Sequence, residues 1–239
     1  MRYFIIGLLT FICLGVALAP ASLITRFVDP QAPVTLLNAR GTVWQGQAEV
    51  VANGRGIGSL RWSVHPLALL TLKVSADWQL DQTLAQLYGQ AILQQALSVS
   101  ATGDIQAHAV NEWLDPYDIY LEGHFQVVDV VARIDQNEAF EDLTGTLNWS
   151  GGLVRFTLSG MLSERHLPPM VTSLTMHEGQ PRAVVVAEGD STPLMIVQPG
   201  IPGYIRIGIT KRFTQMLQRP WPGNDPDHTI VVEVEERVL

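Results

Sequence analysis

Histidine and carboxylate side chains are the groups in this chain best suited to bind a metal or to transfer a proton. The chain has six histidines: His65, His108, His124, His166, His177 and His228. None of them belongs to an H-E-x-x-H or H-x-H pattern. The segment Asp225-Pro226-Asp227-His228 gathers two carboxylates and one imidazole in a proline-bounded loop, but no second histidine stands at ligand spacing. We therefore interpret this loop as a solvated turn.

Phosphate-binding and nucleophilic patterns are also missing or incomplete. Gly54-Arg55-Gly56-Ile57-Gly58 resembles part of a glycine-rich loop. A dinucleotide site needs a strand before that loop and a helix after it. Here we expect a strand on each side, which favours a hairpin turn containing glycines at positive φ. No G-x-S-x-G or Walker pattern occurs, and the neighbouring acids Asp115, Asp118 and Glu122 are better explained by solvation than by acid–base catalysis. We expect no enzyme activity, no metal and no cofactor.

Composition limits the possible partners. The 239 residues are 47% hydrophobic and only 16% charged, with a formal net charge of -8. The apolar content suffices for a folded core, and the acidic balance argues against nucleic-acid binding, which needs a positive patch. The single cysteine, Cys13, excludes an intrachain disulfide and a multi-cysteine metal site.

The amino-terminal segment has the composition of a membrane helix. Tyr3 to Ile24 contains 22 residues without a charge, and such a helix can cross roughly 30 Å of hydrocarbon. Arg2 precedes the run, which favours a cytoplasmic amino terminus. A cleaved signal peptide is the alternative, because Ala17-Leu18-Ala19 and Ala19-Pro20-Ala21 resemble cleavage sites. We favour the uncleaved anchor, since Pro20 would follow the first cleavage point. Either interpretation places the chain from about residue 27 onward outside the cytoplasm.

The rest of the chain has the period-two pattern of β-strands. From Thr71 to Asp81 apolar and polar residues alternate, the apolar set being Leu72, Val74, Ala76, Trp78 and Leu80. Such alternation is typical of antiparallel sheet with one buried face. Further strands are predicted at 97–107, 119–131, 143–149, 154–160, 183–187, 194–197, 204–209 and 229–234. We expect 143–149 and 154–160 to pair through a turn near Gly151-Gly152.

Few helices are predicted. Residues 110–114 can form one turn that ends at Pro116, and residues 210–218 form a short helix that ends before Pro220. Residues 82–95 fit either a helix or a strand, and we favour a strand. The fold class is therefore mainly β. A cytoplasmic start and transmembrane anchor over 1–26 should precede one exported β-rich domain over 27–239, built as a curved or sandwich-like antiparallel sheet.

Tryptophans mark the apolar side of several predicted strands. These residues are Trp44, Trp62, Trp78 and Trp149. The simpler interpretation is that they form ordinary hydrophobic core. The alternative is an apolar concave face that holds a lipid or a partner strand.

Two sequence elements resemble a known family. Gly41-Thr42-Val43-Trp44-Gln45-Gly46-Gln47-Ala48 precedes Gly58-Ser59-Leu60-Arg61-Trp62-Ser63-Val64-His65-Pro66-Leu67-Ala68-Leu69-Leu70. Their key positions are Gly41, Trp44, Gly46, Gly58, Leu60, Trp62 and Pro66. They are similar to the G-x-V/I-W-x-G-x-A and G-x-L-x-W-x-x-x-P-x-x-L-L elements of the type II secretion system protein N family. The segments 145–149 and 203–207 add weaker likeness.

The resemblance implies a component of the machine that moves folded periplasmic proteins across the outer membrane of Gram-negative bacteria. It implies an inner-membrane protein with one crossing, its bulk in the periplasm, and contacts with other secretion subunits, either the inner-membrane platform or the secretin. An assembly or scaffold role is expected, and the family offers no catalytic residues. The family also looks related to AsmA-like proteins with apolar grooves. The alternative function is therefore lipid binding in the cell envelope.

Overall fold

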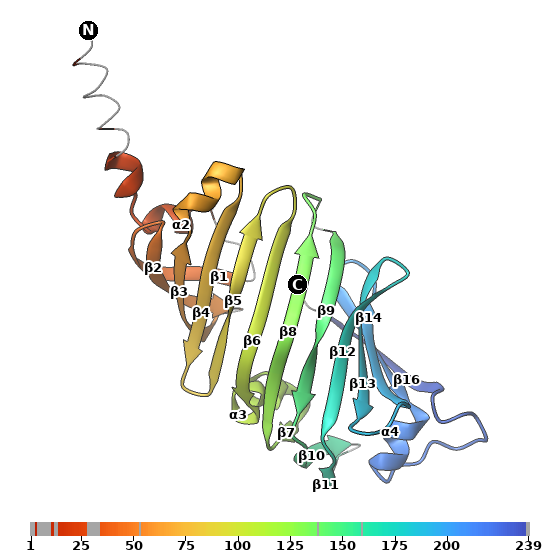
Figure 1. Ribbon diagram of the computed structural model, residues 1–239. Helices are drawn as coiled ribbons and strands as arrows, with labels where there is room; N and C mark the ends of the chain where they lie inside the picture. Colours follow the sequence, from red (N-terminus) through yellow and green to blue (C-terminus); the bar gives the residue numbers. More distant parts are fainter. Residues whose placement is uncertain are drawn as a thin grey trace. The chain divides into compact units, whose positions relative to one another are not determined.

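A computed structural model describes residues 3, 11, 14–27, 34–52, 54–137, 139–158 and 160–237. The chain divides into two compact units, which are described separately below. The first comprises Met1–Thr83 with Tyr88–Gln94, and the second comprises Leu84–Leu87 with Gln95–Leu239. Antiparallel strands dominate both units and the described helices are short (Figure 1), so the predicted mainly-β class is confirmed.

The predicted membrane helix over residues 3–24 lies largely outside the described residues, and so does Cys13. Among the residues described, no helix has the length and apolar character needed to span a bilayer. Residues 14–17 are helical, but Pro20 forms an isolated β-bridge with Thr42. A separate short helix, α2 (Ser22–Phe27), follows. The helix therefore does not run unbroken to Ile24 as predicted, because Pro20 cannot continue it.

The first unit contains an antiparallel meander. Its strands are β1 (Val34–Gly41), β2 (Gln45–Ala52), β3 (Arg55–Val64) and β4 (Val74–Gln82), and a 3-10 helix, η1 (Pro66–Thr71), connects the last two. Each strand pairs with the next. Gly54, at φ 77°, lies in the predicted turn between β2 and β3, whereas the rest of the glycine-rich segment, Arg55 to Gly58, belongs to β3. Most of the ambiguous segment 82–95 is a strand, as favoured, namely β5 (Ala85–Leu93), which follows a turn at Thr83–Leu84. Residues of β5 belong to both units.

Leu72 departs from the predicted alternation. The segment 71–81 was expected to place it on the buried face, but β4 begins only at Val74. Leu72 lies at the end of η1 in the left-handed region, at φ 55°, and its side chain is exposed. Val74, also expected on the buried face, is 42% exposed at the start of β4. The alternation holds from Ala76 to Leu80, where Trp78 and Leu80 are half-buried and Asp77 and Gln79 are exposed.

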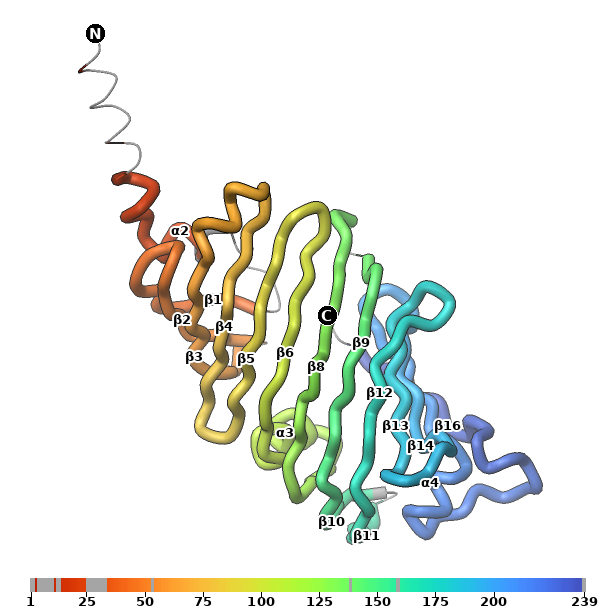
Figure 2. Tube along the Cα trace, in the orientation of Figure 1, coloured from red at the N-terminus to blue at the C-terminus, as the bar shows by residue number. Residues whose placement is uncertain are grey.

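The second unit contains a longer antiparallel sheet, visible from the yellow-green to the blue part of the tube in Figure 2. In spatial order its strands are β6 (Leu97–Gln106), β8 (His124–Ile134), β9 (Phe140–Trp149), β12 (Met170–His177), β13 (Gln180–Ala187), β14 (Pro193–Pro199), β15 (Tyr204–Thr210) and β16 (Ile230–Arg237). Period-two segments predicted each of these strands except β12, for which no strand was predicted, because each predicted strand has one side packed and one side wet.

A second, three-stranded sheet is made by excursions of the chain between strands of the longer one. Its order is β11 (Met161–Leu167), β10 (Gly152–Leu158) and β7 (Ile119–Leu121). Helix α3 (Ala107–Leu114) packs against β7, followed by the 3-10 helix η2 (Asp115–Tyr117), which contains Pro116. The buried amide of Asn111 fixes α3, donating to Leu121 O and accepting from Leu121 N.

Two strand predictions were wrong in the same region. Residues 119–131 were expected to form one strand, but Gly123, at φ 90°, separates β7 from β8. Residues 143–149 and 154–160 were expected to pair with each other. Instead β9 pairs with β8 and β12, while β10 pairs with β11 and β7. Positive φ at Gly151 and Gly152 turns the chain out of one sheet and into the other.

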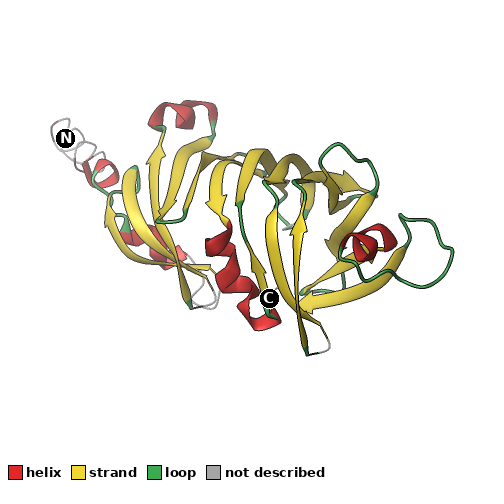
Figure 3. Cartoon of the chain, turned by 90° about the horizontal axis from the view of Figure 1, so that it is seen from below, coloured by secondary structure: helices red, strands yellow, loops and turns green. Residues whose placement is uncertain are grey.

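The core of the second unit joins its two sheets. Its buried members are Trp149, Val154, Leu167, Met170, Val185, Ala187 and Leu194. Helix α4 (Lys211–Met216) adds Phe213 and Met216 to this core, and the Thr210 side chain caps it by accepting from Phe213 N. Thus the helix predicted at 210–218 is confirmed, and strands rather than helices form most of the framework (Figure 3).

Candidate functional site

The two family-like sequence elements meet in space in the first unit. The first element covers the last residue of β1 and the first half of β2, and the second covers most of β3 and of η1. In the β2–β3 register Gly46 faces Trp62 and Ala48 faces Leu60. Leu60 in turn faces Leu80 on β4. The motif residues thus form one continuous piece of sheet, although the sequence alone gave only their order.

Glycine is required at three motif positions for steric reasons. A side chain on Gly46 would collide with the indole of Trp62, which covers that position. At Gly41, which has φ 91°, a Cβ would come within 2.5 Å of Gln45 O. At Gly58, which has φ 150°, it would come within 2.6 Å of Asp81 O. These glycines let the strands bend and approach closely, so their part in the motif is to shape the backbone.

Trp44 joins the amino-terminal segment to the sheet. Its indole Nε1 donates to Val16 O at 2.9 Å. Main-chain bonds from Ala21 N to Gly41 O and from Val43 N to Ala19 O reinforce the joint. Ala21 is almost completely buried. The first motif element therefore holds the chain just after the apolar run, a role that the sequence pattern did not reveal.

Trp62 and Trp78 lie opposite each other on β3 and β4, on the apolar side of the strands. Trp62 Nε1 donates to Val43 O at 3.2 Å. Within the described part of the chain, the buried Nε1 of Trp78 has no hydrogen-bond partner. Trp44, Trp62 and Trp78 are all half-buried and belong to the first unit.

Trp149 has a different setting. It belongs to the second unit, where it is 7% exposed and its ring stacks on Phe125 with 6.3 Å between centroids. Its Nε1 donates to Glu122 O at 2.9 Å. This tryptophan is a core residue, as the simpler of the two interpretations expected.

The opposite face of β3 and β4 is polar. The carboxylate of Asp77 contacts His65 Nε2 at 2.8 Å and accepts from Gln90 Nε2 at 3.1 Å. Arg61 forms an ion pair with Asp81. The side chains of His65, Asp77 and Arg61 are largely exposed, whereas that of Asp81 is 22% exposed. Ion pairs with such exposed partners contribute little to stability. Pro66 follows His65 as the first residue of η1, where its missing N–H costs nothing.

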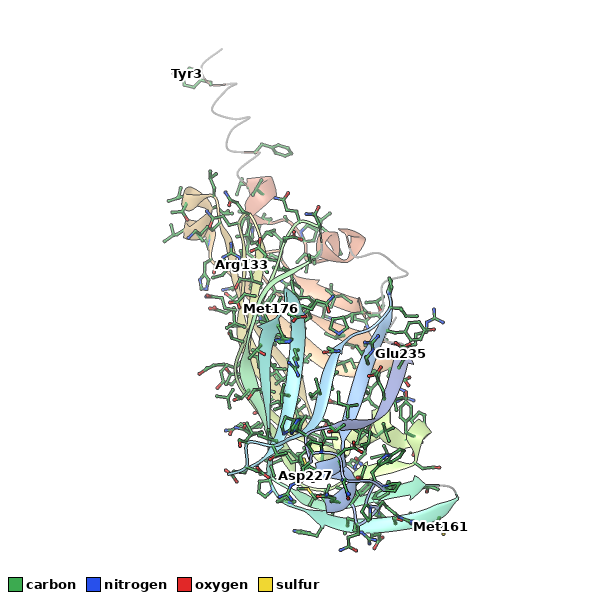
Figure 4. The ribbon with its side chains drawn as sticks, turned by 90° about the vertical axis from the view of Figure 1, so that its right-hand side faces the viewer. Tyr3, Arg133, Met161, Met176, Asp227 and Glu235 are labelled. Carbon is green, nitrogen blue, oxygen red and sulfur yellow. The ribbon has the colours of Figure 1, made fainter. Side chains whose placement is uncertain are left out.

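The acidic loop 225–228 has a structural role. The buried Lys211 donates from Nζ to Gly223 O at 2.6 Å and to Asp225 O at 2.9 Å. Asp227, labelled in Figure 4, accepts from Gln215 of α4. In the described residues, no group of three or more histidine, cysteine or acidic side chains is arranged to hold a metal. The interactions found among the described motif residues are therefore side-chain packing and strand pairing.

Comparison with known protein families identifies the same family that the two motif elements resemble. Residues 32–200 match the family described as "Type II secretion system (T2SS), protein N". This range includes both motif elements and the core strands of both units. Searches among curated proteins and among solved structures found no significant match.

Proposed function

Because the chain belongs to the type II secretion system protein N family, we propose that it is a membrane-tethered scaffold subunit of that secretion machine. The observation that carries this proposal is the family match over residues 32–200, which contains the paired motif elements. Membership implies contacts with other subunits of the machine. The finer proposal is that an amino-terminal anchor holds the sheet at the periplasmic side of the inner membrane, as one domain from residue 27 onward.

The joint around Trp44 supports the tethering part of this proposal. The uncharged run from Tyr3 ends at a segment that hydrogen-bonds to the first motif element through Val16, Ala19 and Ala21. A rigid joint of this kind transmits the position of an anchor to the sheet instead of leaving the sheet on a loose linker. It would raise the local concentration of the sheet near other membrane-bound subunits.

An exposed strand edge supports the scaffold part. Among the described strands, β16 pairs only with β15, so its other edge is open. Its register with β15 is regular from Tyr204–Arg237 to Ile209–Val232, which leaves a straight edge for a partner strand. Strand addition uses main-chain groups and needs no catalytic residue. We propose this edge of β16 as the surface for another secretion subunit.

Gene deletion tests the proposed function. Loss of the gene should impair the export of type II substrates, and the full chain should restore it. Residues 27–239, exported with a cleavable signal peptide, should restore it poorly because the tether is missing. Normal secretion after deletion would contradict the proposal, and full rescue by the untethered fragment would contradict the tethering part.

Topology is tested separately. A reporter that is active only in the periplasm should be active when fused after Leu239. The mature protein should keep Met1 or Arg2. Amino-terminal sequencing that begins at Pro20 or Ser22 would show cleavage and would contradict the anchor.

A second candidate function is lipid binding of the AsmA-like kind. The observation that favours it is the facing pair of half-buried Trp62 and Trp78, in which the Trp78 N–H has no hydrogen-bond partner among the residues that the structure describes. Secretion would then be normal in the deletion strain while the envelope lipid composition would change. Lipid that co-purifies with the exported fragment would also support this function.

A further inference from the structure

The connection between β3 and β4 exposes large apolar side chains to an unusual degree. Leu67, Leu70 and Leu72 are 78%, 83% and 88% exposed, and none of the residues of η1 is buried. Single exposed apolar residues are common on proteins, but clusters of them mark interaction surfaces. We refer to residues 66–72 as the leucine loop.

The leucine loop is held in place by its own backbone. Its main chain is fixed by bonds from Ala68 N to His65 O, Leu72 N to Leu69 O and Lys73 N to Ala68 O. Below it, His65 N donates to Ser75 O on β4. The loop therefore presents its leucines from a fixed support, and their exposure does not come from a lack of structure.

Leu72 has a strained backbone conformation and gains almost no burial on folding. It has φ 55°, a conformation in which glycine is the usual residue at a helix end. It also exposes nearly all of an apolar side chain. Neither packing within the unit nor backbone preference explains a leucine here, which points to a contact outside the chain.

Trp44 is hydrogen-bonded both to the amino-terminal segment and to the end of β3, the strand that leads into the leucine loop. The indole N–H of Trp44 donates to Val16 O, and the main-chain oxygen of Trp44 accepts from Val64 N at 2.7 Å. Val64 lies two residues before the start of η1. Both segments therefore lie at the same end of β2 and β3, as the red and orange helices near the top of Figure 1 show. The described part of the amino-terminal segment also exposes apolar side chains there, those of Leu14, Val16 and Leu18.

We propose that the leucine loop inserts Leu67, Leu70 and Leu72 into the surface of the bilayer that the amino-terminal segment enters. This inference rests on the proposed function and deepens it, because it gives the sheet a second membrane contact. The bilayer is the occupant that fits best, since the exposed set is aliphatic and uncharged and lies at the same end of β2 and β3 as the apolar amino-terminal segment. Lys73 follows the loop and can remain at the headgroup level, as lysines do at membrane surfaces.

Two contacts, the anchor and the loop, fix an orientation that one contact leaves free. With the loop inserted, this end of β2 and β3 faces the membrane. The net charge of -8 gives no general attraction to anionic lipid. The loop contact should therefore depend on the leucines and be insensitive to salt.

Depth-dependent quenching tests the proposal on the full chain. In a Cys13→Ala background, Leu70→Cys is labelled with the fluorophore NBD and reconstituted into nanodiscs of phosphatidylethanolamine and phosphatidylglycerol at 3:1. We expect blue-shifted emission, strong quenching by 5-doxyl lipid and weak quenching by aqueous iodide. Leu162→Cys is the matched control, because Leu162 is a leucine with 69% exposure in the second unit. Its label should respond to iodide instead.

A label on residue 14 tests the proposed membrane anchor independently of the proposed loop insertion. If the Leu14→Cys label is quenched by lipid while the residue 70 label behaves like the Leu162 control, the loop insertion is wrong and the anchor stands. If only the residue 70 label is quenched by lipid, the loop inserts and the anchor is wrong. If both labels respond only to iodide, both ideas are wrong.

A loop variant checks that the effect comes from the leucines. Leu67→Ser, Leu70→Ser and Leu72→Gly together should leave the melting temperature unchanged or raise it, because the residues are exposed and glycine suits φ 55°. An NBD label on Lys73→Cys should lose its lipid quenching in this variant while keeping it in the parent. Equal quenching in both would overturn the role of the leucines, and a strongly lowered melting temperature would show that they pack against the fold.

Discussion

The indole of Trp62 occupies the space into which a side chain at Gly46 would project. The two residues face each other across β2 and β3, and each belongs to a different motif element. A large ring and a missing side chain thus complement each other across the sheet. This relationship explains why the tryptophan and the glycine occur together in the chain, whatever partner the surface binds.

Filling this space should destabilise the first unit. We expect Gly46→Ala to lower the free energy of unfolding by about 1–3 kcal/mol, because its Cβ would displace the Trp62 ring. Chemical denaturation followed by tryptophan fluorescence measures this change. Gly56→Ala is the control, since nothing lies within 4 Å of a Cβ there, and it should be neutral within about 0.5 kcal/mol.

A double mutant tests the cause of that loss. If the Trp62 ring is responsible, Gly46→Ala should cost clearly less in a Trp62→Leu background than in the parent. Strictly additive effects would show that the two residues do not compete for the same space.

Loss of the Trp44 indole N–H should loosen the amino-terminal joint. Trp44→Phe keeps an aromatic ring but removes the donor to Val16 O. We expect faster limited proteolysis between residues 18 and 27, with little change in the unfolding of the second unit. Trp221→Phe, an exposed tryptophan in the second unit, should leave the cleavage rate unchanged. Equal cleavage of the Trp44 variant and the parent would mean that the hydrogen bond does not hold the segment.

Two tryptophans should respond differently to the same substitution. Trp149→Phe removes a buried donor to Glu122 O, and we expect a loss of about 1–3 kcal/mol from the unpaired carbonyl and the lost contacts. Trp78→Phe removes an N–H that has no partner within the described residues, so it should cost less. Thermal unfolding of the two variants gives the comparison. A larger loss for Trp78→Phe would show that its N–H is engaged by a ligand or water.

Asp190 should make stability depend on pH. The main-chain N–H of Thr192 is the largest cause that lowers the pKa of Asp190 below 3.8, with further contributions from the Thr192 side chain, Ser191 N–H and Arg212. Because the folded-state pKa is lowered, the stabilisation is present above the unfolded-state pKa. It is lost as the pH falls through the folded-state pKa. Asp190→Asn should therefore be less stable than the parent at pH 7, and this difference in stability should shrink as the pH falls below the usual carboxyl pKa.

A second variant identifies the cause of this pH dependence. Arg212→Gln removes the ion pair with Asp190, whose atoms are 3.3 Å apart, but it leaves the main-chain donors in place. Most of the pH dependence should survive in this variant. Its complete loss would show that Arg212, and not the turn, stabilises the carboxylate.

The sequence determined the features that depend on near neighbours along the chain. Alternating apolar and polar side chains predicted strands such as β4 and β13, because a strand with one packed side shows this alternation in its own sequence. The start of α4 at Thr210 and its end before Pro220 were also predicted from residues close to each other in the sequence. The two motif elements also predicted the family, which the match over residues 32–200 confirms.

Only the tertiary structure decided which strands are neighbours. Trp149 pairs with Met170 and not with the strand that follows it, because Gly151 and Gly152 lead that strand into another sheet. The position of Trp44 against Val16, and the exposure of Leu72, likewise depend on contacts between distant segments. Period-two alternation carries no information about the partner strand, since any strand with one apolar side shows the same pattern. The identity of that partner is fixed by packing over the whole unit.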